Sequence, residues 1–199
     1  LDLPNHATVA CHATIEMQRR GEELRKMLRE QSRPLLFTRM GLNSGPVVVG
    51  NMGSAERMDY TMMGDVVNLA ARLEGANKFY KTFSMISGST YELAKDDIDS
   101  RQLDIIRVVG KNEPVPVHEL LARKNETSGE MSGVVEQYMK GLKLYQDKNF
   151  KDAIAEFEKV LSIDSEDGPS QTYIKRCGMF LESPPEKDWD GVFTFTEKG

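Results

Sequence analysis

Apolar positions near the start of the chain recur at steps of three and four residues, with charged residues between them. They are Ala10, Ala13, Met17, Gly21, Leu24 and Leu28. This spacing predicts a long amphipathic helix from about Asn5 to Gln31, ended by Ser32-Arg33-Pro34. We expect this helix to lie on a sheet, because its single apolar stripe needs a surface to cover.

The pattern then changes to that of strands. Residues 36–42 alternate and reach Ser44-Gly45-Pro46, after which three valines run into Gly50 and Gly53. These segments predict two antiparallel strands joined by a tight turn.

Helices and strands alternate in the next part of the chain. We predict a helix over 65–77, capped by Asp65, a strand over 82–87, a helical turn over 89–95, and a hairpin of 104–109 with 115–121 around Gly110-Lys111-Asn112. The core face of the first helix holds Val67, Leu69, Ala70 and Leu73. Helices interleaved with antiparallel hairpins indicate the α+β class with a mixed sheet.

The sequence pattern changes in the last third of the chain, from alternating helices and strands to mainly helices. Residues 124–132 are polar and predict a linker. Two helices, 134–148 and 150–163, follow as an αα-hairpin, with a third helix over 169–182. The spacing of Gly141, Phe150, Ala153 and Phe157 is similar to that of a tetratricopeptide repeat, but a single unit has to pack on something else. Residues 192–195 predict a strand or a docking peptide.

Charge and composition exclude some classes of function. The chain is 39% hydrophobic and 29% charged, which suits a folded core. Residues 1–123 carry 16 basic and 16 acidic side chains, so the net charge of −5 falls entirely on residues 124–199. Without a basic footprint, nucleic-acid binding is not expected.

Cysteines, histidines and apolar runs give no sign of a metal site or of secretion. Cys11 and Cys177 lie far apart and predict two reduced thiols, and the three histidines lack metal-site spacing. No apolar run is long enough to span a membrane and no leader is visible, so we expect a cytoplasmic protein. The first residue is Leu1, so an upstream region, and any anchor in it, would be invisible.

Three separated motifs point to one family. They are GLNSGPVVVGNMG, YTMMGDVVNLAARLE and VVGKNEPVPVHEL, in this order. Together they resemble the second half of the class III adenylate/guanylate cyclase catalytic domain, over about residues 6–121. The resemblance implies a sheet derived from the ferredoxin-like fold. The predicted organisation is therefore a cyclase part over 1–123, a linker over 124–133 and a tetratricopeptide-like helical tail over 134–199.

Asn68 and Arg72 are the predicted catalytic residues. Four residues apart on one helix, they share a face and can both reach one phosphorylated ligand. Closure of a cyclic nucleotide builds negative charge on phosphate oxygens, and a guanidinium offers a permanent charge and a planar fork to meet it. The resemblance gives Arg72 this role and gives Asn68 the orientation of the ribose. A helix-surface salt bridge is the alternative for Arg72, and a capping or exposed residue for Asn68.

The resemblance also assigns two substrate-binding residues. Thr61 occupies the family's base-reading position, where a hydroxyl that accepts a hydrogen bond from the adenine amino group favours ATP. Lys111 resembles the lysine that holds the β- and γ-phosphates. A buried strand threonine and an ordinary turn lysine are the alternatives.

No metal ligand is expected in this chain. In the family, two aspartates on earlier strands hold two Mg²⁺ or Mn²⁺ ions, and the chain begins after those strands. Asp65 is better explained as a helix cap, and Asp59 as a local hydrogen-bonding residue.

The resulting prediction is an adenylate cyclase. It implies that a homodimer converts ATP to 3′,5′-cyclic AMP and pyrophosphate by a two-metal mechanism, and that this fragment alone is inactive. A guanylate cyclase is one alternative, and a non-catalytic interaction module whose acidic tail binds a regulator is another. A sheet without its first strands exposes edges, so we also expect self-association or strand exchange, with the tail covering part of the gap.

Overall fold

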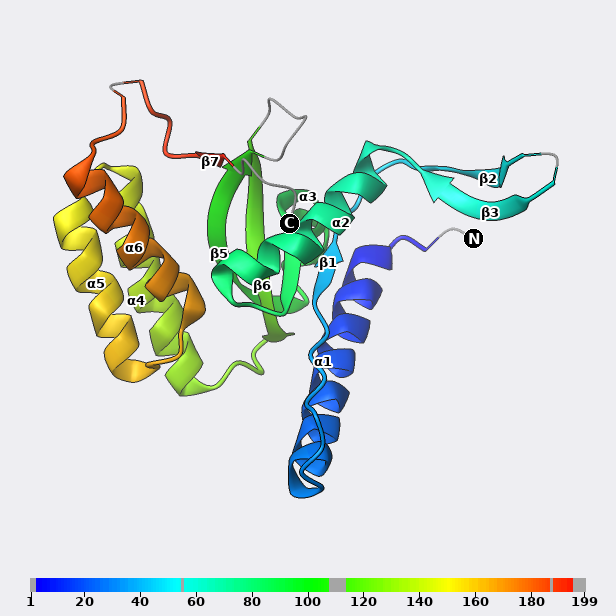
Figure 1. Cartoon of the computed structure of the whole chain (residues 1–199), viewed down its shortest axis with the longest axis horizontal. Coiled ribbons are helices and arrows are strands. Elements are labelled where there is room, and N and C mark those ends of the chain that lie inside the picture. Colours follow the sequence, from blue (N-terminus) through cyan, green and yellow to red (C-terminus); the bar gives the residue numbers. More distant parts are fainter. Residues whose placement is uncertain (1–2, 55, 108–113, 187, 195–199) are drawn as a thin grey trace.

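The structure, a computed structural model, describes residues 3–54, 56–107, 114–186 and 188–194. Its elements follow the chain in the order α1 (His6–Glu30), β1 (Met40–Leu42), β2 (Val48–Gly53), β3 (Met58–Met63), α2 (Asp65–Tyr80), β4 (Ser84–Ser87), α3 (Gly88–Ala94), β5 (Ile98–Arg107), β6 (Val115–Arg123), α4 (Gly129–Gln146), α5 (Phe150–Ile163), α6 (Gly168–Glu182) and β7 (Phe193–Thr194). Figure 1 shows three parts: a central sheet, the α4–α6 helices on one side, and a β2–β3 hairpin that projects on the other.

The central sheet has five strands in the order β1-β4-β6-β5-β7. The β1–β4 and β5–β7 pairs are parallel, whereas β4–β6 and β5–β6 are antiparallel. This mixed sheet with helices confirms the predicted α+β class and the final hairpin. Residues 192–195 were expected to form a strand or a docking peptide, and Phe193–Thr194 add a strand at the β5 edge.

The pairing predicted for residues 36–42 is wrong. We expected them to form a hairpin with the valine segment that follows, but β1 pairs with β4 and its Gly41 lies opposite Met85. The valine segment instead forms β2, which pairs with β3 in a separate two-stranded sheet that places Gly50 opposite Thr61. The chain therefore returns to the sheet only after α2, and a parallel pair requires such a crossover.

Helices cover both faces of the central sheet. Because successive strand residues point to opposite faces, neighbours in β4 enter different cores. Met85 packs with Leu73 of α2, whereas Ile86 packs with Cys11 of α1 and Ala94 of α3. The long N-terminal helix thus lies on the sheet as predicted, on the face opposite α2.

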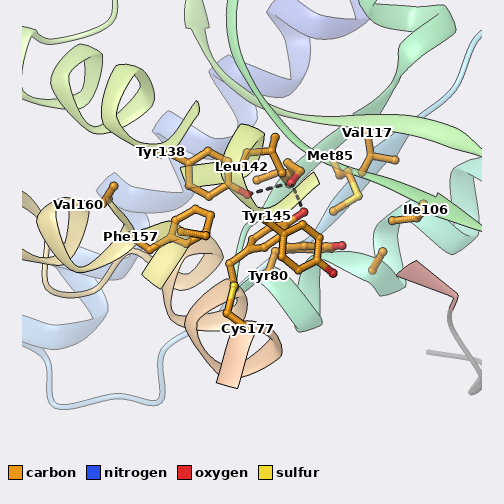
Figure 2. Packing of buried hydrophobic residues seen from close by; sticks show 14 of the residues in the cluster. Tyr80, Met85, Ile106, Val117, Tyr138, Leu142, Tyr145, Phe157, Val160 and Cys177 are labelled. Carbon is orange, nitrogen blue, oxygen red and sulfur yellow. Dashed lines mark hydrogen bonds between the residues drawn. The ribbon is translucent and has the colours of Figure 1, made fainter. Parts of the chain in front are cut away.

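The C-terminal helices share the core that contains α2. Tyr80, Met85, Leu103 and other residues before 124 form one buried cluster with the C-terminal residues Val134, Tyr138, Leu142, Tyr145, Phe157, Val160, Tyr173 and Cys177. Figure 2 shows the aromatic rings of this cluster gathered between the helices and the sheet. The helical hairpin therefore has the packing partner that a single unit needs.

The connection into these helices is shorter than predicted. We expected a linker over 124–133, but α4 begins at Gly129, where the Ser128 side chain accepts a hydrogen bond from the Met131 backbone N–H. A serine in this position caps a helix start. The likeness of α4 and α5 to a tetratricopeptide repeat stays a prediction. Across the described residues, no helix has the length and apolarity needed to cross a membrane.

Candidate functional site: the exposed face of α2

The predicted catalytic residues lie on α2, which starts directly after the hairpin. Gly64 precedes the helix with a φ of 149°, a backbone conformation that favours glycine. The expectation that Asp65 caps this helix is wrong: Gly64 occupies the cap position and Asp65 is the first helical residue. A carboxylate in the first turn still interacts favourably with the helix dipole.

Strand β1 holds α2 by close backbone contact. A Cβ atom added to Gly41 would lie 2.3 Å from both the Ala70 carbonyl oxygen and the Glu74 backbone nitrogen. Only glycine permits this approach, which lies beside the helical turn that contains Arg72. The Asn43 amide adds a bond at the start of the helix by donating to the Val66 carbonyl at 2.9 Å.

A buried asparagine fixes the second half of α2. The Asn77 amide nitrogen donates to the carbonyl oxygens of Met40 and Leu73, each at 3.0 Å, and its side-chain oxygen accepts from the Thr82 hydroxyl at 2.8 Å. Because both ends of this amide are satisfied inside the protein, they cost little to bury. The helix is thus tied to the neighbouring strand along its length.

Asn68 and Arg72 are exposed on the same side of this fixed helix. Leu69 and Leu73, each one residue further along, are buried. Within the described part of the chain, neither the Asn68 amide nor the Arg72 guanidinium has a hydrogen-bond or ion-pair partner. The salt bridge considered as the alternative for Arg72 is therefore not formed among these residues. An exposed amide and guanidinium one turn apart can meet a phosphorylated ligand.

Thr61 lies on β3, close to the point where the hairpin leads into α2. Its side chain is exposed, so the alternative of a buried strand threonine is not what the structure shows. Asp59 on the same strand lies 3.6 Å from Arg57 in a solvent-exposed ion pair, which agrees with a local role.

The described residues do not include the second predicted substrate-binding residue. Lys111 lies in 108–113, outside the described residues. In the ranges that the structure describes, no group of three or more His, Cys, Asp or Glu side chains is placed to hold a metal ion. The described residues therefore do not fit the divalent cation that the family resemblance implies.

Comparison with known proteins decides the family. Residues 2–122 match the model of the "Adenylate and Guanylate cyclase catalytic domain". This chain belongs to that cyclase family. The match contains α1 to α3 and β1 to β5, includes the exposed face of α2, and ends at residue 122 in β6, before α4.

Individual cyclases are also similar to this chain. Adenylate cyclase 1 of Rhizobium meliloti is 36% identical over 116 residues, which are 58% of this chain and 17% of that protein. Among solved structures, the adenylyl cyclase CyaB from P. aeruginosa matches with a TM-score of 0.53 and 35% identity, covering 61% of this chain and 62% of that one. The guanylyl cyclase Cya2 matches with a TM-score of 0.50 and 29% identity, covering 61% of each chain.

Sequence analysis of this cyclase domain missed the residues that hold α2. Gly41 lies within a quoted motif, but only the helix backbone beside it shows why a side chain is not tolerated there. The sequence indicates Asn77 only as the end of a predicted helix. The buried contacts of Tyr80 with the C-terminal helices carry no local signal, because the partners are distant in sequence.

Proposed function

We propose that the protein is an adenylate cyclase that converts ATP to 3′,5′-cyclic AMP and pyrophosphate. The observation that carries this proposal is the exposed Asn68–Arg72 pair on a helix of the cyclase family. Similar proteins are named adenylate cyclase, and the chain spans only a small part of their length. The activity of the whole protein is therefore a proposal.

The chemistry is a displacement at the α-phosphorus. The ribose 3′-oxygen forms a bond to this phosphorus, the bond from it to the bridging oxygen of pyrophosphate breaks, and the 3′-hydroxyl proton leaves to a base. Negative charge grows on the phosphate oxygens as the leaving group departs. We assign Arg72 to these oxygens, because its charge is permanent and its fork matches phosphate. Asn68 holds the ribose so that the 3′-oxygen faces phosphorus.

The substrate-binding roles complete this proposal. Thr61 accepts a hydrogen bond from the adenine amino group, and Lys111 binds the terminal phosphates. Mg²⁺ or Mn²⁺ belongs to the family reaction, but no step is assigned to a metal because the described residues offer no fitting ligands.

Replacing Arg72 tests the catalytic assignment. In the full natural protein, the Arg72→Ala variant should have a kcat about 10³- to 10⁵-fold lower than the wild type. Arginines in other phosphoryl-transfer enzymes contribute this much to kcat. The assay follows cyclic AMP formed from ATP with a divalent cation. Lys78→Ala is the matched control, since Lys78 is an exposed cation on the same helix. Unchanged turnover in Arg72→Ala, with the fold intact by circular dichroism, would reject the role.

Guanylate cyclase is the second candidate, because the guanylyl cyclase Cya2 is also similar in structure. Competition between ATP and GTP separates the two. A higher kcat/KM for GTP would remove the base assignment of Thr61. If neither ATP nor GTP is converted to a cyclic nucleotide, the alternative of an interaction module is favoured, in which the acidic C-terminal region binds a protein partner.

A homodimer is part of the proposal, and the hairpin offers a surface for it. Its exposed apolar side chains include Val49, Tyr60 and Met62, which share one face of the hairpin, and Tyr60 is 75% exposed. Such a group of apolar side chains marks an interaction site. We predict concentration-dependent self-association in light scattering, which Val49→Lys should weaken. Met179→Lys, a change at an exposed apolar residue of α6, should have no effect. A monomer at high concentration would contradict this prediction.

A further inference from the structure

The C-terminal end of α2 is enclosed by α6, which lies beyond the region matched by the cyclase family. Tyr80, the last residue of α2, is fully buried and donates its hydroxyl to the Asp104 carboxylate of β5 at 2.6 Å. Arg176 of α6 donates to the same Asp104 oxygen at 2.6 Å and to the Tyr80 hydroxyl at 3.1 Å. The three side chains form a closed triangle between α2, the sheet and α6.

This triangle is well shielded from water. Arg176 is 6% exposed and Asp104 is 1% exposed. Burial, together with the adjacent Asp104 charge, raises the pKa of the Tyr80 hydroxyl, so it remains a donor. The Arg176 guanidinium also lies 5.2 Å from the centres of the Tyr80 and Tyr173 rings. A charge buried in this way restricts the position of its partners, because each alternative arrangement would leave it without compensation.

Backbone contacts join the same two helix ends. The Thr172 hydroxyl of α6 donates to the Phe79 carbonyl of α2 at 2.8 Å. A Cβ atom on Gly168, the first residue of α6, would lie 2.4 Å from the Tyr80 carbonyl oxygen. The positive end of α6 thus meets the negative end of α2, an arrangement that stabilises both helix ends.

A second buried cluster holds α6 against the sheet. Arg101 of β5 donates to Asp167 at 2.7 Å and to Glu119 of β6 at 2.6 Å. Asp167 is also the cap of α6, where it accepts a hydrogen bond from the Ser170 backbone N–H at 2.9 Å. The start of α6 therefore has a fixed place on the sheet, and α2 ends against it.

Because α2 is a rigid helix, the position of its C-terminal end affects the position of residues further along it. Arg72 lies eight residues before Tyr80, which is about 12 Å along a helix. A small change in the direction of the helix at its anchored end therefore displaces the Arg72 guanidinium. A misplacement of about 1 Å costs on the order of 10²-fold in rate when a group must meet a transition state.

We propose that Arg176 is a positioning residue for the Asn68–Arg72 pair, so that the C-terminal helices set the geometry of the catalytic face. This inference rests on the proposed cyclase function. It gives the helices beyond the family match an indirect part in the reaction, through the position of α2.

The first test measures α2 without using activity. Hydrogen exchange of the backbone amides of 65–80 is compared in the wild type and in Arg176→Met, Tyr80→Phe and Thr172→Val. We expect exchange in this helix to rise about tenfold or more in Arg176→Met, while α1 on the opposite face stays protected. Lys175→Met, an exposed neighbour on α6, is the matched control. Unchanged exchange in α2 would overturn the inference.

The second test separates positioning from stability. With ATP as substrate and all variants folded at the assay temperature, Arg176→Met should lower kcat about 10²-fold and leave KM within about threefold of the wild type. Arg176→Lys should recover part of kcat, since it restores the charge but not the fork. If Arg176→Met does not fold, the milder Tyr80→Phe and Thr172→Val variants decide, with smaller losses in kcat.

Arg72→Ala separates a failure of the catalytic assignment from a failure of the positioning role. If Arg72→Ala is inactive while the folded Arg176, Tyr80 and Thr172 variants keep the wild-type kcat, the proposed function stands and the positioning role is wrong. If Arg72→Ala keeps full activity, the catalytic role of Arg72 is wrong, and the inference fails with it, whereas the absence of cyclic AMP formation in the wild type would reject the proposed function itself. If kcat falls in Arg72→Ala and in Arg176→Met, and Arg176→Met keeps the KM of the wild type, the proposed function and the positioning role are both supported.

Discussion

His118 illustrates how burial alone changes the chemistry of a residue. It lies on β6 with its ring stacked on Tyr91 at a centroid distance of 4.1 Å, and only 8% of the residue is exposed. Burial lowers the pKa of this histidine from 6.5 to about 4, while the nearby Glu92 charge opposes the change. The neutral ring is therefore the form that the folded protein favours.

This lowered pKa predicts a loss of stability in mild acid. Below pH 6.5 the unfolded chain takes up a proton that the folded chain resists until about pH 4, so the free energy of unfolding falls as the pH decreases through this window. We expect a decrease of about 2 kcal/mol between pH 7 and pH 5, measured by urea unfolding.

A phenylalanine at this position provides the control. His118→Phe keeps an aromatic ring for Tyr91 but cannot titrate, so its stability should change less over the same pH range. Carboxylates titrate in both proteins and cancel in the comparison. Equal slopes for the two proteins would show that His118 does not contribute.

Single residues were predictable from the sequence where the signal was local. The helical spacing of Asn68 and Arg72 placed them on one face, and the structure shows both exposed. The Tyr80–Asp104–Arg176 triangle was not predictable. Its members lie 24 and 72 residues apart along the chain, and no periodicity links them.

At the scale of elements, Gly141 sets how closely α4 approaches α5. A Cβ atom there would lie 2.8 Å from a ring carbon of Phe157, which is fully buried. Alanine is a better helix former than glycine, but here its methyl group would displace the ring. We therefore expect Gly141→Ala to lower the free energy of unfolding by about 1 to 2 kcal/mol.

Gly133 is the matched control on the same helix. A Cβ atom at Gly133 has no neighbour within 4 Å, so Gly133→Ala should raise the free energy of unfolding by about 0.5 to 1 kcal/mol. Chemical denaturation of both variants gives the comparison. Stabilisation by Gly141→Ala would show that α4 and α5 are not in close contact.

The elements themselves followed from hydrophobic periodicity better than their pairing did. The helices near 6–30, 65–80 and 150–163 were predicted with small errors at their ends. The partner of β1 was not, because sequence proximity favours a hairpin, whereas β1 pairs with β4 across the intervening hairpin and helix. Pairing depends on which surfaces the helices bury, which is a property of the assembled sheet.

At the scale of the whole molecule, one hydrophobic core contains residues from the family match and from the helices that follow it. Removing residues 124–199 would expose Tyr80, Leu103 and Ile106, which are fully buried in the whole chain. We predict that a protein ending at Arg123 aggregates or loses its cooperative thermal transition, as followed by light scattering and calorimetry. A soluble monomer with the melting temperature of the whole chain would mean that the helices contribute nothing to the cyclase part.

The packing of the last helices was not accessible from the sequence. The polar stretch after residue 123 predicts a linker, whereas α4 starts at Gly129, within that stretch. Nothing in the sequence shows that the rings of Tyr138, Tyr145 and Tyr173 pack between helices and sheet.

The last strand has a practical consequence for anyone who purifies this protein. Thr194 pairs with Arg107, the residue directly before the segment that contains Lys111. A foreign segment fused directly behind Thr194 would therefore begin beside the residue that leads into the proposed phosphate-binding segment. Kinetic measurements are therefore safest on protein from which any C-terminal tag has been cleaved.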